Sequence, residues 1–343
     1  MKKMKILVTG GTGYIGSHTV VELINSGFDV LIADNLSNSN IDVLSSIKKI
    51  TGVEPAFTNI DLSDQEKTAN YFSQLKNIDA IIHFAAFKAV GESVEKPLKY
   101  YKNNIQSLIN VVEGMQNNNF NNLVFSSSCT VYGQAEKLPV TEETPILKAD
   151  SPYGNTKQIC EEIISDYSKM NINKKFVLLR YFNPIGAHES GLIGELPIGV
   201  PGNLVPFITQ TTAGLREVLS VYGNDYNTFD GTPIRDYIHV TDLAKAHVLS
   251  VKRMFDTNNS NLEIFNLGTG RGNSVLEVIK TFEEVTNQKI NYKIVQRRPG
   301  DIEQVWADTK LANTILGWKA ELSLAQALLS SWNWEKKYRE KQK

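Results

Sequence analysis

A tyrosine and a lysine offer proton-transfer chemistry in the middle of this sequence. The segment from Tyr153 to Lys157 reads Tyr-Gly-Asn-Thr-Lys. Residues at positions i and i+4 of a helix lie on the same face, so we expect the phenol and the ammonium side by side. A neighbouring positive charge stabilises a phenolate and lowers its pKa from about 10. Tyr153 is therefore a candidate general base for the hydroxyl of an alcohol, with Lys157 as its partner.

A serine run upstream supplies a candidate partner for the same substrate hydroxyl. Ser126, Ser127 and Ser128 follow an apolar segment that predicts a strand, and open α/β sheets place their chemistry at the carboxyl ends of strands. The Ser128 hydroxyl could hold a substrate alcohol beside the phenol. Serines after a strand are also ordinary turn residues, and Tyr-x-x-x-Lys often lies on a solvated helix face. The occurrence of both motifs together favours the catalytic interpretation.

The amino-terminal residues have the pattern of a dinucleotide-binding unit. Residues 6–8 are all apolar, as expected of a buried parallel strand, and a glycine-rich turn follows over 9–16. Near-helical spacing of apolar residues predicts a helix over 17–26, and a second strand follows over 28–33. An acidic residue, Asp34, ends that strand. The order is strand, glycine turn, helix, strand and acid.

The glycines of the turn suit a pyrophosphate group. In Gly10-x-x-Gly13-x-x-Gly16, one glycine makes the turn, one lets the phosphates approach the backbone, and one lets the helix pack on the strand. The start of the helix adds N–H donors and a positive dipole. Asp34 is placed to bind the adenosine ribose, and its charge favours NAD over NADP. A generic glycine turn is the alternative, which the complete strand-helix-strand context disfavours.

The alternation of strands and helices continues and then changes character. Further apolar segments predict strands at 80–84, 123–125 and 176–181. After these, glycine and proline become frequent and the elements shorter, with one strand expected at 235–240. We therefore predict an α/β protein with a Rossmann-type doubly wound parallel sheet over residues 1–181. A smaller C-terminal α/β substrate domain is expected over 182–343, with some segments interleaved with the first.

Several polar residues outside these motifs are candidate ligand contacts. Asp61 and Leu62 follow the third apolar segment and could reach an adenine. Asn103, on an expected helix, is either a polar contact to the cofactor or a solvent-exposed residue. Arg235 and Arg298 suit a diphosphate. Each arginine could instead form a surface ion pair.

The composition limits the classes of function. The chain has 343 residues and a formal net charge of −1, which does not indicate a nucleic-acid-binding surface. Cys129 and Cys160 form neither a disulfide framework nor zinc-ligand spacing, and the histidines show no ligand pattern, so we expect no metal site. We expect neither a signal peptide nor a membrane span, because the apolar run after the basic start ends by Thr9 and no stretch is long enough to cross a membrane. We predict a cytoplasmic protein with no membrane partner.

Taken together, these motifs resemble the extended short-chain dehydrogenase/reductase family. The segments that carry this resemblance are 9–16, 34–36, 126–128, 153–157 and 180–184. Four further segments are similar to the UDP-glucose 4-epimerases within that family, namely 88–93, 97–101, 235–240 and 242–244. The resemblance extends from Met4 to about Trp334.

The resemblance implies an isomerase that interconverts UDP-galactose and UDP-glucose through a 4-keto sugar. A tightly held NAD would be reduced and reoxidised in each turnover. Tyr153 would take the proton of the 4-hydroxyl, Lys157 would lower the tyrosine pKa and hold the nicotinamide ribose, and Ser128 would bind the same hydroxyl. Family members are commonly homodimers, which implies an interface through the helices that start near Pro97 and Tyr153.

The resemblance also implies two sets of binding residues. The residues expected to bind NAD are Gly10, Gly13, Tyr14, Ile15, Gly16, Asp34, Asn35, Leu36, Ser37, Asn38, Ser39, Asp61, Leu62, Phe84, Ala85, Ala86, Lys88, Asn103, Lys157 and Phe182. The residues expected to line the UDP-sugar site are Ser128, Tyr153, Asn183, Asn203, Leu204, Tyr222, Arg235, Arg298, Asp301 and Val305.

One position departs from some members of the family. Val305 falls where some of these epimerases carry a bulky tyrosine beside the sugar, and valine leaves more room. The resemblance therefore implies a pocket that also admits the 2-acetamido sugars UDP-N-acetylglucosamine and UDP-N-acetylgalactosamine.

The alternatives are another NAD-dependent nucleotide-sugar epimerase or reductase of the same family and, from a different class, a non-catalytic NAD-sensing protein. Dehydration is disfavoured by the sequence. A sugar-nucleotide dehydratase would carry an Asp-Glu pair after the strand-end serine, whereas this chain has Cys129-Thr130-Val131. A nucleotide-sugar reductase would need exchangeable NAD(P)H, so turnover without added cofactor separates it from an epimerase. A non-catalytic NAD-sensing protein tends to lose the tyrosine or the lysine, and both are present here.

Overall fold

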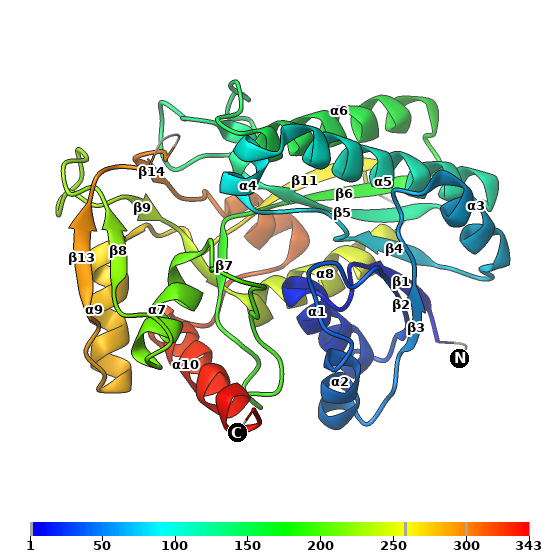
Figure 1. Ribbon diagram of the computed structural model, residues 1–343. Coiled ribbons are helices and arrows are strands. Elements are labelled where there is room, and N and C mark those ends of the chain that lie inside the picture. The colour runs from blue at the N-terminus through cyan, green and yellow to red at the C-terminus, as the bar shows by residue number, and fades with distance from the viewer. Residues whose placement is uncertain (1–2, 257–258, 299–300, 343) are drawn as a thin grey trace.

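The chain folds around a seven-stranded parallel sheet. The computed structural model describes residues 3–256, 259–298 and 301–342 (Figure 1). The strands of the sheet lie in the order β11-β6-β5-β4-β1-β2-β3, and every pairing between them is parallel. Their bounds are β1 Lys5–Thr9, β2 Asp29–Asp34, β3 Ala56–Asn59, β4 Ala80–His83, β5 Asn122–Ser128, β6 Lys175–Tyr181 and β11 Leu262–Leu267.

The predicted buried parallel strands are present because both faces of the sheet are covered. In β1, the side chains of Ile6, Leu7 and Val8 are all fully buried, although successive residues of a strand point to opposite faces. Ile6 and Val8 join one apolar cluster and Leu7 joins the other. A strand with two buried faces needs a continuous apolar run, which is what residues 6–8 provide.

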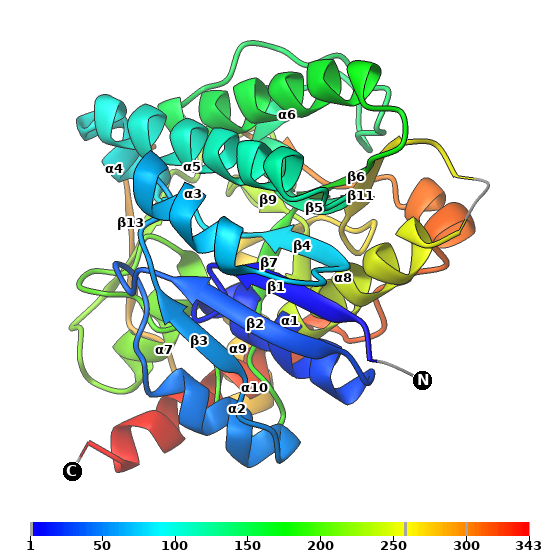
Figure 2. The same cartoon turned by 90° about the vertical axis from the view of Figure 1, so that its right-hand side faces the viewer.

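Helices cover the two faces as separate layers (Figures 1 and 2). Helices α3, α5 and α6 lie on one face, and α1, α2 and α8 lie on the other. Their bounds are α1 Tyr14–Asn25, α2 Val43–Thr51, α3 Gln65–Gln74, α5 Pro97–Asn117, α6 Pro152–Met170 and α8 Val240–Met254, with the short α4 Val90–Glu95 before α5. This arrangement is the Rossmann-type doubly wound sheet that the sequence predicts.

Smaller elements lie beyond the carboxyl edge of the sheet and surround their own apolar cluster (Figure 1). They form a parallel pair β10-β7, a parallel pair β13-β8 and a three-stranded sheet β12-β9-β14. Their bounds are β7 Asn183–Ile185, α7 Leu204–Thr212, β8 Leu219–Tyr222, β9 Ile234–Arg235, β10 Tyr237–His239, β12 Asn273–Ser274, α9 Val275–Thr286, β13 Tyr292–Val295, β14 Gln304–Val305 and α10 Leu324–Glu340. The domain boundary at residue 181 stays a prediction. From the second half of the chain, β11 is a strand of the large sheet and α8 covers one of its faces.

Two elements differ from the sequence-based expectation. The expected strand 123–125 runs on to Ser128, because Ser126, Ser127 and Ser128 pair with β6. The expected strand at 235–240 is interrupted at Asp236, whose buried carboxylate accepts hydrogen bonds from neighbouring loops. Among the helices of the described residues, none is long and apolar enough to cross a membrane.

Candidate active site

The amino-terminal end of α6 fixes the position of Tyr153. Ser151 is the N-cap of the helix, and its Oγ accepts a hydrogen bond from the backbone N–H of Gly154 at 3.1 Å. Pro152 occupies the first turn, where a missing N–H costs no helical hydrogen bond. These two residues set where the helix begins. Tyr153 therefore projects from its first turn, beside the carboxyl end of β5.

Lys157 lies one helical turn further on, and the structure brings it to Tyr153. The Lys157 Nζ is 6.0 Å from the centroid of the Tyr153 ring and 4.8 Å from that of Phe125. It donates a hydrogen bond to the carbonyl oxygen of Ser126 at 2.5 Å. The side chain is almost fully buried, and burial lowers the pKa of Lys157 to about 8. Its ammonium is thus only weakly favoured over the neutral amine near neutral pH.

The pKa of Tyr153 differs from the expected direction. Burial raises it to about 12, and the neighbouring Ser128 hydroxyl opposes that rise. In the chain alone this pKa is therefore raised, whereas the expectation was that Lys157 lowers it. The reason is that the phenolate loses its hydration while the ammonium points at the Ser126 carbonyl. Tyr153 needs further positive charge nearby before it can act as a base near neutral pH.

Ser128 ends β5 and begins the 3₁₀ turn Cys129–Tyr132. Its Oγ accepts a hydrogen bond from the backbone N–H of Thr130 at 3.2 Å, which fixes the side chain at the strand end. Because the hydroxyl also neighbours the phenol of Tyr153, the structure brings together all three predicted catalytic residues.

The glycine turn between β1 and α1 leaves no room for side chains. A Cβ on Gly10 would lie 2.8 Å from the backbone N of Ala85, and one on Gly16 would overlap the Gly10 carbonyl oxygen. Gly10 also has a φ of 69°, which favours glycine. Helix α1 has Gly13 as its N-cap and no side-chain capping hydrogen bond, so its first N–H groups can receive a phosphate. The turn therefore fits the pyrophosphate of NAD.

Asp34 is buried at the end of β2, next to the glycine turn. Its carboxylate accepts hydrogen bonds from the backbone N–H of Thr12 at 3.1 Å and of Leu36 at 2.9 Å. These contacts hold the acid and the loop of residues 35–39 at the edge where the adenosine ribose is expected. Asp61, which was expected at the adenine, is exposed and accepts a hydrogen bond from the backbone N–H of Ser63, and the neighbouring Leu62 is buried.

An asparagine that the sequence analysis did not single out joins the segment after β4 to both adjacent helices. Asn104 exchanges two hydrogen bonds with the backbone of Phe87, at 2.9 and 3.0 Å, and donates a third to Thr156 of α6 at 3.1 Å. The predicted Asn103 is half-buried and donates to the Asn104 side chain. The segment with Phe84, Ala85 and Ala86 is thereby held beside the carboxyl end of β1.

The Glu195 carboxylate contacts one predicted cofactor-binding residue, Lys88, and one predicted substrate-binding residue, Asn203. The Nζ of Lys88 lies 2.9 Å from Glu195 Oε1, and Asn203 donates to the same oxygen at 2.7 Å. Asn203 is also the N-cap residue of α7, which Leu204 begins. Glu195 lies in the glycine- and proline-rich segment, where no local pattern in the sequence identifies it.

Four of the predicted UDP-sugar residues form two pairs. Arg235 donates to Asp301 Oδ1 at 2.5 Å and to the carbonyl oxygen of Ile302 at 2.6 Å. The guanidinium of Arg298 lies 4.5 Å from the centre of the Tyr222 ring. The Arg235 side chain is largely buried, so this pair is not a surface ion pair.

Two further substrate candidates lie closer to the sheet. Asn183 begins β7, directly after Phe182. Val305 belongs to β14 and is 2% exposed, packed in a cluster with Val131, Tyr132 and Phe182. The valine therefore contributes to a packed apolar wall behind the 3₁₀ turn that follows Ser128.

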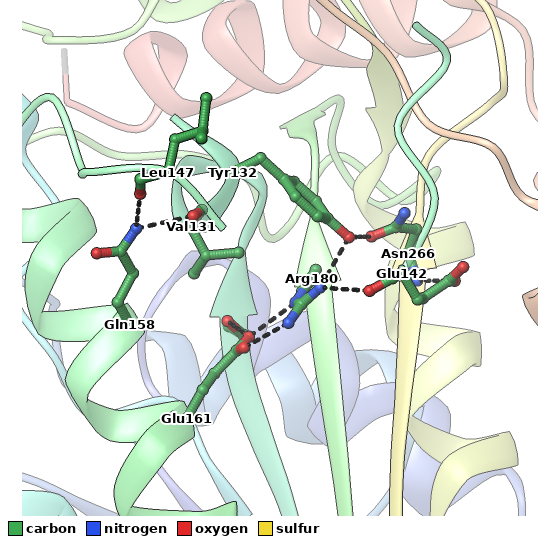
Figure 3. A network of polar contacts seen from close by, with 9 residues as sticks. Val131, Tyr132, Glu142, Leu147, Gln158, Glu161, Arg180 and Asn266 are labelled. Atoms are coloured by element: carbon green, nitrogen blue, oxygen red, sulfur yellow. Dashed lines mark hydrogen bonds and ion pairs between the residues drawn. The ribbon is translucent and has the colours of Figure 1, made fainter. Parts of the chain in front are cut away.

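A buried polar network beneath the site was also not predicted (Figure 3). Arg180 of β6 forms a bidentate ion pair with Glu161 of α6, with Nε to Oε1 at 3.0 Å and Nη2 to Oε2 at 2.6 Å. Arg180 also donates to Tyr132, and Ser127 donates to Glu161 at 2.5 Å. An arginine within an apolar strand was the available signal, because a buried charge requires a partner.

Several known proteins are similar to this chain over nearly its whole length. The family model described as GDP-mannose 4,6 dehydratase matches residues 7–330. The UDP-glucose 4-epimerase of Bacillus subtilis (strain 168) is 49% identical over 332 residues, which cover 97% of this chain and 97% of that protein.

Two solved structures are similar over nearly the whole chain. The UDP-glucose 4-epimerase from Bifidobacterium longum, in complex with NAD+ and UDP, has a TM-score of 0.94 and 46% identity, and the match covers 98% of this chain and 99% of that one. The enzyme of the same name from Stenotrophomonas maltophila, with bound NAD and formylated UDP-arabinopyranose, has a TM-score of 0.95 and 45% identity, with the same coverage.

Proposed function

The chain belongs to the UDP-glucose 4-epimerases of the extended short-chain dehydrogenase/reductase family, and from this premise we propose which of its residues perform each part of the reaction. It is an NAD-dependent isomerase that interconverts UDP-galactose and UDP-glucose through a 4-keto sugar. Bound NAD would supply the hydride acceptor and donor for the sugar's C4 carbon, and its oxidised ring would add a positive charge to the site.

The cofactor is held along the carboxyl edge of the sheet. The glycine turn and the first turn of α1 receive the pyrophosphate, for which the absence of side chains leaves room. Asp34, fixed by Thr12 and Leu36, binds the adenosine ribose. Residues 84–88, Asn103 and Phe182 complete the nicotinamide half of the site.

Tyr153 moves the proton of the sugar's 4-hydroxyl. Ser128 holds that hydroxyl beside the phenol, and Lys157 holds the nicotinamide ribose and adds positive charge. Burial alone raises the pKa of Tyr153 to about 12. The base form therefore depends on both positive charges, that of Lys157 and that of the bound cofactor. Excluding water from these buried groups strengthens each of these interactions.

The UDP group is anchored on the smaller elements beyond the sheet edge. Arg235 belongs to β9 and Arg298 follows β13. Arginine suits a diphosphate because its planar fork donates to two oxygens at once. The Arg235–Asp301 ion pair fixes one guanidinium before substrate binds. Asn183, Asn203, Leu204 and Tyr222 line the remainder. The anchored UDP lets the 4-keto sugar turn over and present its opposite face.

The observation that carries this proposal is the buried Lys157 one turn from Tyr153, with Ser128 at the adjacent strand end. The experiment is to incubate the purified protein with UDP-galactose, without added cofactor, and to separate the products by chromatography. We expect UDP-glucose to form, because the hydride returns to the same sugar. Turnover only with added NAD(P)H would indicate a net reductase.

We further propose that UDP-N-acetylglucosamine and UDP-N-acetylgalactosamine are substrates. Val305 is smaller than the tyrosine expected at this position in some family members, and it lies in the cluster next to Phe182. The same assay with UDP-N-acetylgalactosamine tests the idea. Efficient turnover of UDP-galactose with no turnover of the acetamido sugar would contradict it.

We also propose a cytoplasmic homodimer joined through α5 and α6. Exposed apolar residues support this interface, since Val94 is 61% and Leu98 80% exposed around the start of α5. A cytoplasmic location suits the two cysteines, both of which are free. Sedimentation should give a dimer that Leu98→Asp weakens and Phe229→Asp, in an exposed loop elsewhere, does not. A wild-type monomer would contradict the proposal.

A further inference from the structure

Lys157 shares its helix face with a carboxylate. Glu161 follows Lys157 by one turn of α6, so both side chains point toward β5 and β6. Lys157 is 4% exposed and Glu161 5%. A buried lysine and a buried glutamate at this spacing would normally pair, because each charge lacks water.

The structure shows a different pairing. Both oxygens of Glu161 are taken by Arg180, and Ser127 donates a third hydrogen bond to Oε1 (Figure 3). Lys157 donates instead to the Ser126 carbonyl. Within the part of the chain that the structure describes, no carboxylate oxygen lies within 4.0 Å of the Lys157 Nζ.

Arg180 is itself held in place by the 3₁₀ turn that follows Ser128. Its Nη1 donates to the Tyr132 hydroxyl at 2.9 Å, and its guanidinium lies 4.9 Å from the centre of that ring. The Tyr132 hydroxyl in turn donates to Asn266 of β11 at 2.6 Å. The arginine is 2% exposed, so its charge has no alternative partner in solvent.

We propose that Arg180 is a positioning residue for the epimerisation: it holds Glu161 in a bidentate ion pair and so keeps that carboxylate from pairing with Lys157. Lys157 then stays free to face Tyr153 and the nicotinamide ribose. The inference rests on the proposed function, since it assigns a reason for the free ammonium that the reaction requires.

Loss of Arg180 has a defined electrostatic consequence. Glu161 would be left with a buried charge, and Lys157 is the cation one turn away. An ion pair between them would cancel the positive charge that Tyr153 depends on, so the phenol would ionise only at higher pH. The other titratable groups facing Lys157 are Tyr153 and Cys160 on α6 and His83 at the end of β4.

The test compares two variants that break the same ion pair from opposite sides. Arg180→Met leaves Glu161 without its cation, whereas Glu161→Gln leaves Lys157 free. Both lose stability, because each leaves one buried charge unpaired. We expect kcat of folded, NAD-loaded Arg180→Met to fall by about tenfold or more, with the acid limb of its pH profile about one unit higher. Glu161→Gln should keep kcat within about threefold and an unshifted limb.

The double variant Arg180→Met/Glu161→Gln removes both charges and should restore the rate and the pH profile. The NAD content released on unfolding is measured for each protein, so that cofactor loss is not mistaken for a slower reaction. Arg253→Met is the matched control. It breaks the bidentate pair between Arg253 of α8 and Glu263 of β11, and it should leave kcat unchanged.

Equal loss of kcat in Arg180→Met and Glu161→Gln, or a wild-type rate in Arg180→Met, would overturn the proposal. If Arg180→Met does not fold, Arg180→Lys keeps the buried charge but loses the bidentate contact. It should then show a smaller shift of the same sign, and an unshifted limb would overturn the proposal. Failure of the wild-type protein to convert UDP-galactose would instead contradict the proposed function.

Discussion

At the scale of single residues, the site places two opposing demands on Tyr153 and Lys157. Both side chains need to be buried to meet a sugar and a nicotinamide away from water, and burial disfavours both charged forms. It raises the pKa of Tyr153 to about 12 and lowers that of Lys157 to about 8. Without the cofactor, Tyr153 is therefore a neutral phenol, and the ammonium form of Lys157 is only weakly favoured. The cofactor's charge is needed to shift the phenol toward its base form.

This burial should be measurable as pH-dependent stability in cofactor-free protein. The folded-state pKa of Lys157 is lowered from 10.5 to about 8, so the folded state binds fewer protons than the unfolded state between these values. Stability from this group is therefore lowest below pH 8 and is recovered as pH rises toward 10.5. The difference corresponds to about 3 kcal/mol.

Lys157→Met removes this contribution. Urea unfolding is measured from pH 7 to 10. The free energy of unfolding of the variant, relative to that of the wild type, should be most favourable at pH 7 and should become less so as pH rises. A difference between the two proteins that stays constant with pH would contradict the assignment of a lowered pKa to Lys157.

At the scale of elements, the first turn of α6 determines the position of the catalytic Tyr153 side chain. The start of the helix is set by its N-cap, Ser151, and by Pro152 at its first position. Tyr153 directly follows Pro152. A small shift of this helix start would move the phenol relative to Ser128 on β5. Misplacement by about 1 Å can cost on the order of a hundredfold in rate.

Ser151→Ala should therefore affect both stability and catalysis. Loss of an N-cap typically costs about 1 kcal/mol. The matched control is Ser323→Ala, which removes the N-cap of α10, far along the chain from the catalytic residues. Both variants should lower the urea midpoint by a similar amount, but only Ser151→Ala should lower kcat. An unchanged kcat in Ser151→Ala would show that the cap does not position Tyr153.

At the scale of the whole molecule, a buried carboxylate joins the sheet edge to the smaller elements. Asp236, next to Arg235, is fully buried and accepts hydrogen bonds from the backbone N–H groups of Thr269, Gly270 and Ala307 at 2.8, 3.1 and 3.2 Å. Three segments distant in sequence therefore meet at one side chain. This junction holds Arg235 relative to the large sheet.

Asp236→Asn keeps the shape of the side chain but replaces one acceptor with a donor. One or more of the three N–H groups would then face an NH₂ group, and an unsatisfied buried donor costs about 1–3 kcal/mol. We expect a lower unfolding midpoint and a raised KM for UDP-galactose, because the end of β9 that carries Arg235 loses its anchor. Wild-type stability and KM would contradict this role for Asp236.

The sequence was sufficient for features that depend on local pattern. The buried strand at 6–8, the glycine turn and the Tyr153–Lys157 spacing each follow from periodicity or from residue type at fixed intervals. The features that were missed depend on contacts between distant segments. Glu195 and Asn104 have no local signature, and Arg180 gives only the signal of a charge within an apolar strand. Lys88 lies 107 positions from Glu195, Thr156 lies 52 from Asn104, and Glu161 lies 19 from Arg180.

The pKa of Tyr153 was missed for a related reason. Its lysine neighbour is visible in the sequence, but the extent of burial and the direction of the ammonium are set by β5, which packs against α6 only in the folded chain. Spacing predicts which groups are adjacent, whereas the sign of a pKa shift depends on everything that surrounds them.

The most direct test of the central claim is the rate of UDP-galactose conversion by Tyr153→Phe that carries its full content of bound NAD. The variant removes one oxygen atom from a half-buried side chain and should fold with its cofactor. The account predicts that kcat falls by about 10²- to 10⁴-fold, as expected when a general base is lost. A rate equal to that of the wild type, with cofactor and stability unchanged, would contradict the role of Tyr153 as the base.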